Sequence, residues 1–390
     1  MKKKTALISL ALACLMTFSA CEGQSGNGSV TDGSGAQTEQ TPAPVPEFNE
    51  SLTTAEVVKD MGLGINLGNT MEAIGGETAW GSPKITKEII KGYADSGFGV
   101  LRIPVAWSNK MDKNDKEYTI DKDLMARVKE ITQWTVECGM YAIVNIHWDN
   151  GWWSEFPKDK ENCMKKYTRI WEQITGEFKD FNGRVMFESL NEEGGWESLW
   201  NRYSQQGDKE ASYGLLNEIN QKFVDIVRSS GGNNKTRHLL IAGYNTDIDL
   251  TCDELFKMPD DSEKRCAVSV HYYTPSTFCI LKEDADWGKL QKTWGSEKDV
   301  KELTKNMDKM KESFVDKGIP VIIGEFSVCE KKVKELDSVR LFITSVVKEA
   351  TARGMCPVLW DITGDYYNRN TCQFIDGELL QGMKDANANK

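Results

Sequence analysis

Short apolar runs alternate with longer segments of helical periodicity between residues 61 and 361. Five of these runs follow a glycine and end in polar or aromatic residues: FGVLRIP, MYAIVNIHW, RVMFESLNE, IPVIIGEF and MCPVLWD. Glycine is expected just after a helix, and an apolar run without alternation is typical of a strand buried on both faces. Three similar runs, MGLGINLG, HLLIAGYN and CAVSVHYY, bring the number of predicted strands to eight.

The segments between these runs carry apolar residues at the spacing of one helix face. Two such faces consist of Leu124, Val128, Ile131, Trp134 and Cys138, and of Leu336, Val339, Ile343, Val346 and Ala350. Eight strands that alternate with helices predict an α/β fold of the closed (β/α)8 type, the TIM barrel, as a single domain over residues 47–390. An open, doubly wound sheet is the alternative.

The first 46 residues have a different composition. Three lysines, Lys2–Lys4, precede a mostly apolar stretch from Ala6 to Ala20. This stretch is too short to span a membrane, because a membrane-spanning helix needs about 20 residues. We interpret residues 1–20 as a signal peptide. Because Phe18, Ser19 and Ala20 precede Cys21, the segment resembles a lipobox, in which that cysteine is lipidated. An ordinary secretory signal is the alternative.

Residues 21–46 are rich in Gly, Ser, Gln, Thr and Pro, which predicts a flexible polar linker. We therefore expect an exported protein, either a lipoprotein of the bacterial cell surface or outer membrane, or a secreted protein. Eight cysteines follow Cys21, and we favour buried thiols over disulfides because a domain of this size needs no covalent cross-links.

The net charge of −11 comes from 48 basic and 59 acidic residues in short mixed runs. Such a chain offers no basic surface for a phosphate backbone, so nucleic acid is not an expected partner. No motif for a nucleotide or a metal is present, since the chain lacks G-x-x-x-x-G-K-[ST] and H-E-x-x-H and has only three histidines. We therefore expect neither a cofactor nor a metal ion, and we expect a monomer.

In a (β/α)8 barrel the chemistry lies at the carboxyl ends of the strands. Two glutamates occur there after apolar strands, Glu192 after VMFESLN and Glu325 after VIIG. A carboxylate that is buried at the end of an apolar strand lowers the stability of the fold by several kcal/mol unless a cation or hydrogen-bond donors lie next to it. The available partners at other strand ends are Arg102, His147, His271 and Tyr273. His238 begins a strand instead, so we expect it on the opposite face of the barrel, in a structural role.

Paired carboxyl groups in separate environments are what hydrolysis of a glycosidic bond requires, because one donates a proton and the other attacks the sugar. A buried structural ion pair is the alternative for one such glutamate. The tryptophans favour the sugar interpretation, since ten of the twelve fall on strand ends or on the loops that follow them. Aromatic faces stack on sugar rings, and we expect about half of these ten to contact sugar.

The strand-end motifs resemble those of glycoside hydrolase family 5, the cellulase family, over about residues 52–385. They are LRIPV with Arg102, NIHW with His147, the Asn191-Glu192 pair, HYY with His271 and Tyr273, IGEF with Glu325, and VLWD with Trp360. The segments GINLGNTMEA and ETAWGSP are similar to those of its bacterial endo-β-1,4-glucanases.

The resemblance implies a role for each matching residue. Glu192 would be the acid/base and Glu325 the nucleophile of a retaining mechanism. Asn191 would contact the sugar 2-hydroxyl, and Arg102 and Tyr273 would keep Glu325 ionised. The remaining expected substrate contacts are His147, His271, Trp360, Asn66 and Trp148. One departure is Glu193, because the family usually has Pro after the acid/base.

The expected partner is a β-glucan polysaccharide, with β-1,4-glucan first, mixed-linkage glucan or xyloglucan next and mannan last. We identify no separate carbohydrate-binding module in the sequence, and therefore expect a preference for soluble or amorphous chains over crystalline cellulose. A surface glycan-binding lipoprotein without catalysis is the competing hypothesis. It would keep the tryptophans but would have no reason to keep both Glu192 and Glu325.

Overall fold

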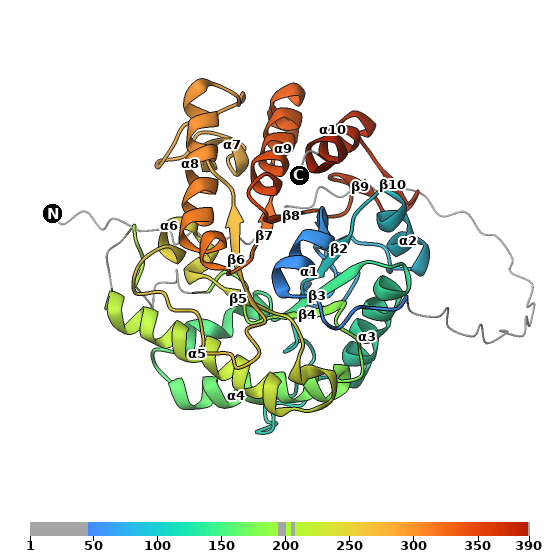
Figure 1. The fold of residues 1–390 in the computed structure, drawn as a ribbon, viewed down its shortest axis with the longest axis vertical. Helices are drawn as coiled ribbons and strands as arrows, with labels where there is room; N and C mark the ends of the chain where they lie inside the picture. The colour runs from blue at the N-terminus through green and yellow to red at the C-terminus, as the bar shows by residue number, and fades with distance from the viewer. Residues whose placement is uncertain (1–45, 194–199, 204–206, 389–390) are drawn as a thin grey trace, which may run out of the picture. The chain divides into compact units, whose positions relative to one another are not determined.

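Eight parallel strands form a closed barrel in a computed structural model that describes residues 46–193, 200–203 and 207–388. The strands pair in chain order, and β8 returns to pair with β1 (Figure 1). Their bounds are β1 Gly64–Asn66, β2 Val100–Ile103, β3 Tyr141–Asn145, β4 Val185–Glu188, β5 Leu239–Ala242, β6 Cys266–Tyr272, β7 Val321–Phe326 and β8 Cys356–Leu359. The predicted (β/α)8 barrel is confirmed, and the open sheet is wrong.

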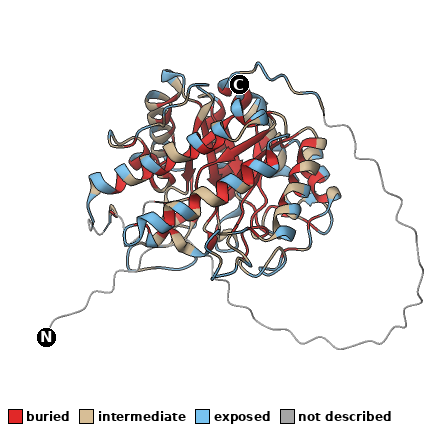
Figure 2. Cartoon of the chain, turned by 90° about the horizontal axis from the view of Figure 1, so that it is seen from below, coloured by how far each residue is buried: buried red, intermediate tan, exposed pale blue. Residues whose placement is uncertain are grey.

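Helices surround the strands. They are α1 Thr54–Met61, α2 Lys87–Asp95, α3 Lys122–Glu137, α4 Lys160–Phe178, α5 Lys209–Ser229, α6 Ile248–Thr251, α7 Ser276–Cys279, α8 Glu297–Ser313, α9 Leu336–Thr351 and α10 Gly377–Ala388. The exception is α1, which precedes β1 and packs against the apolar end of the barrel interior. A small antiparallel pair, β9 Tyr367–Asn368 and β10 Gln373–Phe374, lies between β8 and α10. The strands are buried, and the long helices bury one side and expose the other (Figure 2).

The two predicted helix faces are largely buried. Val128 and Ile131 of α3 lie in the core, as do Val339, Ile343, Val346 and Ala350 of α9. Leu336 is an exception, because it is the first residue of α9 and is 56% exposed. Trp134 is only half-buried, and the guanidinium of Arg127 lies over its ring.

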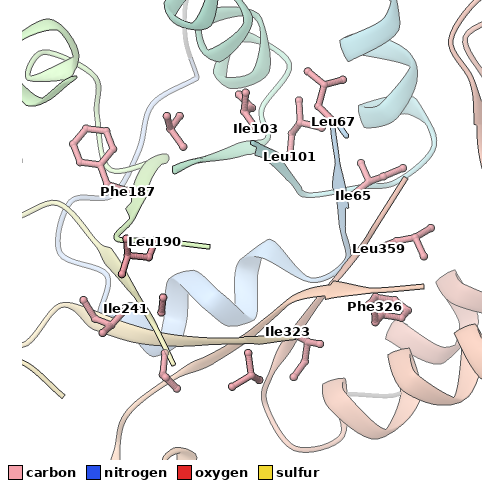
Figure 3. Close-up of a cluster of buried hydrophobic side chains, with 14 of the residues drawn as sticks. Ile65, Leu67, Leu101, Ile103, Phe187, Leu190, Ile241, Ile323, Phe326 and Leu359 are labelled. Atoms are coloured by element: carbon pink, nitrogen blue, oxygen red, sulfur yellow. The ribbon is translucent and has the colours of Figure 1, made fainter. Parts of the chain in front are cut away.

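One apolar layer lies between the strands and the helices, and Figure 3 shows part of it, with Ile65, Leu101, Ile103, Phe187, Ile323 and Leu359 among its members. Successive strand residues face opposite sides, so Val100 and Arg102 of β2 both face the interior of the barrel. Val100 belongs to a second apolar cluster, which includes Val57 and Met61 of α1. The interior therefore changes from apolar side chains near α1 to polar ones at the carboxyl ends of the strands.

His238 lies at the opposite end of the barrel from these polar side chains, as predicted. It is fully buried, and its Nδ1 lies 2.9 Å from the hydroxyl of Thr54 at the start of α1. Burial and the neighbouring Arg265 lower its pKa to about 3, so the ring is neutral. None of the eight cysteines in the described residues takes part in a disulfide. No helix there is both long and apolar enough to cross a membrane.

Candidate active site

Arg102 is the centre of the polar end of the barrel. Its side chain has no exposed surface, and it donates from Nε to Glu188 at 2.7 Å, from Nη1 to Glu325 at 2.8 Å and from Nη2 to Asn191 at 2.9 Å. Burial alone would lower the pKa of Arg102, but Glu188 and Glu325 raise it above its ordinary value. The guanidinium is therefore charged and fixed, and it orients groups from three different strands or loops.

Asn66 supports this arginine from β1. Its side-chain oxygen accepts from Nη1 of Arg102 at 3.0 Å, and its amide donates to the carbonyl of Gly324 at 2.9 Å. Asn66 and Arg102 are both fully buried, so Arg102 is placed to hold Glu325, as expected from the resemblance, and the expected substrate contact of Asn66 stays a prediction. Both side chains lie beneath the surface of the site and orient the residues above them.

Glu325 lies within β7, near its end, and is 4% exposed. Its Oε1 accepts from Arg102, and its Oε2 accepts from the hydroxyl of Tyr273 at 2.9 Å. Burial raises the pKa of Glu325, while His271 and Arg102 act in the opposite direction. Burial and Glu325 in turn raise the pKa of Tyr273, so that this phenol stays protonated and donates. The contacts of Glu325 thus favour its carboxylate form.

Glu192 lies in the loop after β4, four residues past the last residue of the strand, Glu188, rather than at the strand end itself. Its Oε1 lies 2.7 Å from Nδ1 of His271, and the same nitrogen is 3.6 Å from Oε2 of Glu325. One donor atom each from Glu192, His271 and Glu325 all lie within 4.8 Å of one another. The two predicted carboxyl groups therefore meet at one histidine.

The two glutamates differ in solvent contact. The side chain of Glu192 is 29% exposed, whereas that of Glu325 is 5% exposed. Glu325 is held by a guanidinium and a phenol, which stabilise negative charge. Glu192 has an imidazole beside it and is accessible to solvent. The geometry provides one carboxyl group suited to attack and another suited to proton transfer.

His147 and Trp360 form the aromatic side of the site. Their rings are parallel to within 4°, with centroids 5.7 Å apart. Burial, Arg102 and His271 lower the pKa of His147 well below its usual value, so this ring is neutral. Trp360 follows β8 directly and is half-buried, as is Trp148, which follows His147. Both indoles retain surface that a ligand can contact.

Glu188 is a member of this network that the sequence analysis missed. It is the last residue of β4, is fully buried, and accepts from Arg102 at 2.7 Å and from the hydroxyl of Ser269 at 2.8 Å. The signal was an acid within the apolar run VMFE, at the interior-facing position two residues after Met186. Without Glu188, the charge of Arg102 would have a single carboxylate partner.

A sequence profile of the family described as Cellulase (glycosyl hydrolase family 5) matches residues 66–365. The chain belongs to this family. Its site is thus that of a glycoside hydrolase, an enzyme class in which two carboxyl groups flank the bond that is cleaved. The profile spans β1 to β8 and includes every residue that the resemblance assigned to the site.

Relatives named as endoglucanases match most of the chain. Endoglucanase A of Paenibacillus barcinonensis is 32% identical over 86% of this chain and 91% of its own length. Endoglucanase B of Clostridium cellulovorans is 34% identical over 85% of this chain and 75% of its own. A solved structure, described as a GH5-4 broad specificity endoglucanase from an uncultured bovine rumen ciliate, superposes with a TM-score of 0.78 at 34% identity, covering 87% of this chain and 99% of that one.

The described tryptophans of this family 5 enzyme divide by burial. Trp107, Trp153, Trp200 and Trp294 have at most 8% of their surface exposed, so these four strand-end or loop tryptophans pack the protein. Trp148, Trp152 and Trp360 are half-buried, and Trp80 and Trp287 are 40% and 50% exposed. Trp196 lies outside the described residues. The position of a tryptophan on a strand end or loop was therefore not enough to predict whether its ring is buried in the protein or accessible to a ligand.

Glu193, the departure from the usual family 5 motif, points into the protein. It is 5% exposed, and its Oε2 has no hydrogen-bond partner among the described residues. Burial, Glu192 and Asp149 raise its pKa well above the ordinary value. Its carbonyl accepts from the backbone N–H of Asn245, which anchors this residue to the loop after β5. Glu193 is thus a buried acid next to the candidate acid/base, in surroundings that favour its neutral form.

A second buried network supports the loop that carries Trp360. Arg369 is 2% exposed, donates to the carbonyl of Asp361 at 3.3 Å and lies 3.6 Å from its carboxylate. The same Asp361 carbonyl accepts from the N–H of Gly68 at 3.0 Å, which joins the loops after β1 and β8. Burial raises the pKa of Asp361 to about 6 and that of Glu72 to about 7. These groups hold the aromatic side of the site from below.

Proposed function

We propose that this chain is an endo-acting β-1,4-glucanase that cleaves internal bonds of cellulose-type polysaccharides by double displacement, with retention of the anomeric configuration. The observation that carries the proposal is the meeting of Glu192 and Glu325 at His271, with donor atoms within 4.8 Å of one another. Retaining glycosidases separate their carboxyl groups by about 5–5.5 Å, whereas inverting enzymes need about 6.5–9.5 Å to admit a water molecule.

In this mechanism Glu325 attacks the anomeric carbon, and Glu192 protonates the leaving oxygen. A glycosyl-enzyme forms, and Glu192, now a base, activates the water that releases the sugar. Arg102 and Tyr273 favour the ionised form of Glu325 before attack. Asn191 is held at the rim by Arg102, where it can donate to a sugar hydroxyl, and Trp360 offers a flat face beneath the sugar.

The names of relatives guide the choice of polymer. Besides the endoglucanases above, a relative from Bacteroides ovatus is named as a xyloglucan-specific endo-β-1,4-glucanase, with 32% identity over 83% of this chain and 68% of its own length. We rank β-1,4-glucan first, mixed-linkage glucan and xyloglucan second, and mannan last. A common feature of the first three is that they contain runs of β-1,4-linked glucose, which the same subsites beside Glu325 would accept.

The test is a panel of soluble glucans assayed by viscosity and by reducing ends. An endo-acting enzyme lowers the viscosity of carboxymethyl cellulose before many reducing ends form. Glu325→Gln and Glu192→Gln should abolish both signals, and Glu283→Gln, on an exposed loop, should leave them unchanged. Activity on mannan alone would contradict the ranking, and full activity of Glu325→Gln would contradict the site.

We also propose the domain organisation and location expected from the sequence. Residues 1–20 would be a signal peptide and residues 21–46 a linker, followed by the catalytic domain at 47–390. In support, the described residues, 46–193, 200–203 and 207–388, all belong to one compact unit, while residues 1–45 lie outside the described part. A lipid on Cys21 would hold a monomeric enzyme at the surface of the cell. Light scattering that gives the mass of one chain would support the monomer, and twice that mass would contradict it.

A further inference from the structure

We propose that Glu192, His271 and Glu325 form a binding site for a divalent transition metal ion of the zinc or copper class, and that the ion inhibits the enzyme reversibly by occupying the position of the scissile bond. This inference goes beyond the proposed glucanase activity, which needs no metal. It concerns a second ligand of the same three side chains, and it can be tested without any sugar.

The donor atoms are close to the spacing that a metal ion needs. Nδ1 of His271 lies 2.7 Å from Glu192 and 3.6 Å from Glu325, and all three donors lie within 4.8 Å of one another. Zinc bonds to nitrogen and oxygen are about 2.0–2.2 Å long, so two ligands of a tetrahedral ion lie about 3.5 Å apart. Closing the site therefore requires a shift of about an ångström.

The three ligands differ in where they lie. The side chain of Glu192 lies on a loop and is 29% exposed, whereas those of His271 and Glu325 lie in strands and are 4% and 5% exposed. A Cβ at residue 324 would come within 3.1 Å of Nε2 of His271, so Gly324 gives the imidazole its space. Two rigid donors and one adjustable donor suit capture of an ion from solution.

The charge of the site also favours a cation. Two carboxyl groups, from Glu188 and Glu325, contact the guanidinium of Arg102, and a third, from Glu192, lies beside His271. When Glu192 has lost the proton that it donates in catalysis, the three carboxylates and Arg102 together carry a net charge of −2, which a divalent ion would neutralise. Arg102 contacts Oε1 of Glu325, while Oε2 is the atom that faces His271, so the guanidinium does not block the metal position.

The donor set selects the kind of metal. An imidazole with carboxylates suits zinc and copper, whereas magnesium and calcium prefer oxygen ligands alone. Three protein ligands leave a position for water, as in zinc sites that are not purely structural. Nε2 of His271 is buried without a hydrogen-bond partner in the described residues. Because a partner on the second nitrogen normally strengthens a histidine ligand, the binding should be reversible and removable by a chelator.

The experiment is calorimetric titration of the full chain with zinc chloride in the absence of sugar. We expect one ion to bind, with no heat from magnesium chloride at the same concentration. Glu192→Gln and His271→Asn should each weaken zinc binding at least tenfold. A cello-oligosaccharide at saturation should prevent binding, and zinc should raise the KM for soluble glucan without a change in kcat. Persistence of binding in both variants would overturn the proposal.

Cysteine provides the necessary control, because thiolates are strong zinc ligands. Cys329 lies four residues after Glu325, so Cys329→Ser should bind zinc as the wild type does. Loss of binding in this variant would assign the ion to the thiol and overturn the proposal. If circular dichroism shows that a variant does not fold, X-ray absorption spectroscopy of the wild-type zinc complex identifies the ligands instead. Nitrogen and oxygen ligands around zinc are expected, and a sulfur ligand would contradict the site. Zinc binding without glucanase activity would contradict only the proposed function.

Discussion

Arg102 is bound on both sides by acids from different strands, with Nε 2.7 Å from Glu188 and Nη1 2.8 Å from Glu325. One contact is structural and the other reaches the candidate nucleophile. Breaking a buried ion pair by removing one partner leaves an uncompensated charge, which costs about 3–5 kcal/mol. The guanidinium of Arg102 therefore contributes both to the stability of the barrel interior and to the orientation of Glu325.

The first prediction concerns that dependence. Glu188→Gln should lower the free energy of unfolding by about 3 kcal/mol, the lower end of that range, because Arg102 loses one of its two carboxylate partners at a position without exposed surface. Denaturant unfolding followed by circular dichroism measures the effect. Ser269→Ala, which removes only a neutral donor to Glu188, should cost about 1 kcal/mol and serves as the control. Equal losses in the two variants would show that the charge is not the cause.

The barrel and most of the site were predictable from the sequence because each depends on local patterns. Buried parallel strands are continuous apolar runs, and the carboxyl end of each run places a side chain such as Glu325 or Arg102 on one rim. Burial was harder to predict. Asn66 and Trp107 end or follow strands as Trp360 does, but packing of the loops above them decides which side chains reach solvent.

Contacts between distant residues were also outside the reach of sequence patterns. Arg369 and Tyr93 are 276 positions apart and meet only because the barrel closes between β8 and β1. Nothing in the sequence near Arg369 indicates its partners. Glu188, by contrast, left a local signal, since an acid at an interior-facing strand position needs a buried cation.

The second prediction concerns the aromatic platform. Trp360→Ala should weaken the binding of a stacked sugar by about 1–3 kcal/mol and should also lower the rate constant, because the ring is expected beneath the reacting sugar. Trp360→Phe keeps an aromatic face and should recover part of the loss. Steady-state kinetics on a soluble glucan measure the rate constant and the KM of each variant. The melting temperature of each variant shows whether it is folded. Wild-type rate constant and melting temperature in Trp360→Ala would remove Trp360 from the site.

The third prediction concerns pH and Glu193. Its folded-state pKa is raised well above the ordinary 4.5, so the stability it contributes is fully present below pH 4.5 and is lost as pH rises through the folded value. Relative to the wild type, Glu193→Gln should therefore gain stability as pH rises from 5 to 8, by up to about 1.4 kcal/mol per pH unit within the window. Urea unfolding at several pH values measures this difference. Exposed Glu283→Gln should follow the wild type, and a pH-independent difference for Glu193→Gln would contradict the prediction.

The fourth prediction concerns location. If Cys21 carries a lipid, Cys21→Ser should move the enzyme from the membrane fraction to the soluble fraction of cells, with unchanged kinetics, because Cys21 is not part of the predicted catalytic domain, residues 47–390. Activity assays on fractionated cells measure the distribution. The replacement of another cysteine, Cys138→Ser, should leave the enzyme in the membrane fraction. An unchanged distribution of Cys21→Ser would contradict the lipoprotein hypothesis.

The last prediction separates the roles of Glu192 and Glu325. Glu325→Ala should abolish formation of the glycosyl-enzyme, since the attacking carboxylate is gone. Glu192→Ala should still be glycosylated by an activated aryl glycoside, whose leaving group needs no proton, and should then stall for lack of a base. Mass spectrometry of the trapped enzyme measures this difference.

Azide makes the two roles visible in the products, because a small anion can enter the space that each missing carboxyl group leaves. In Glu325→Ala it attacks the β-glycoside directly, and a single displacement gives an α-glycosyl azide. In Glu192→Ala it attacks the α-linked glycosyl-enzyme, and the second displacement gives a β-glycosyl azide. Products of opposite configuration would mean that the two roles are exchanged. Time-resolved NMR of the wild type should show the β-anomer first, and an α-anomer as the first product from a β-glucan would overturn the retaining mechanism.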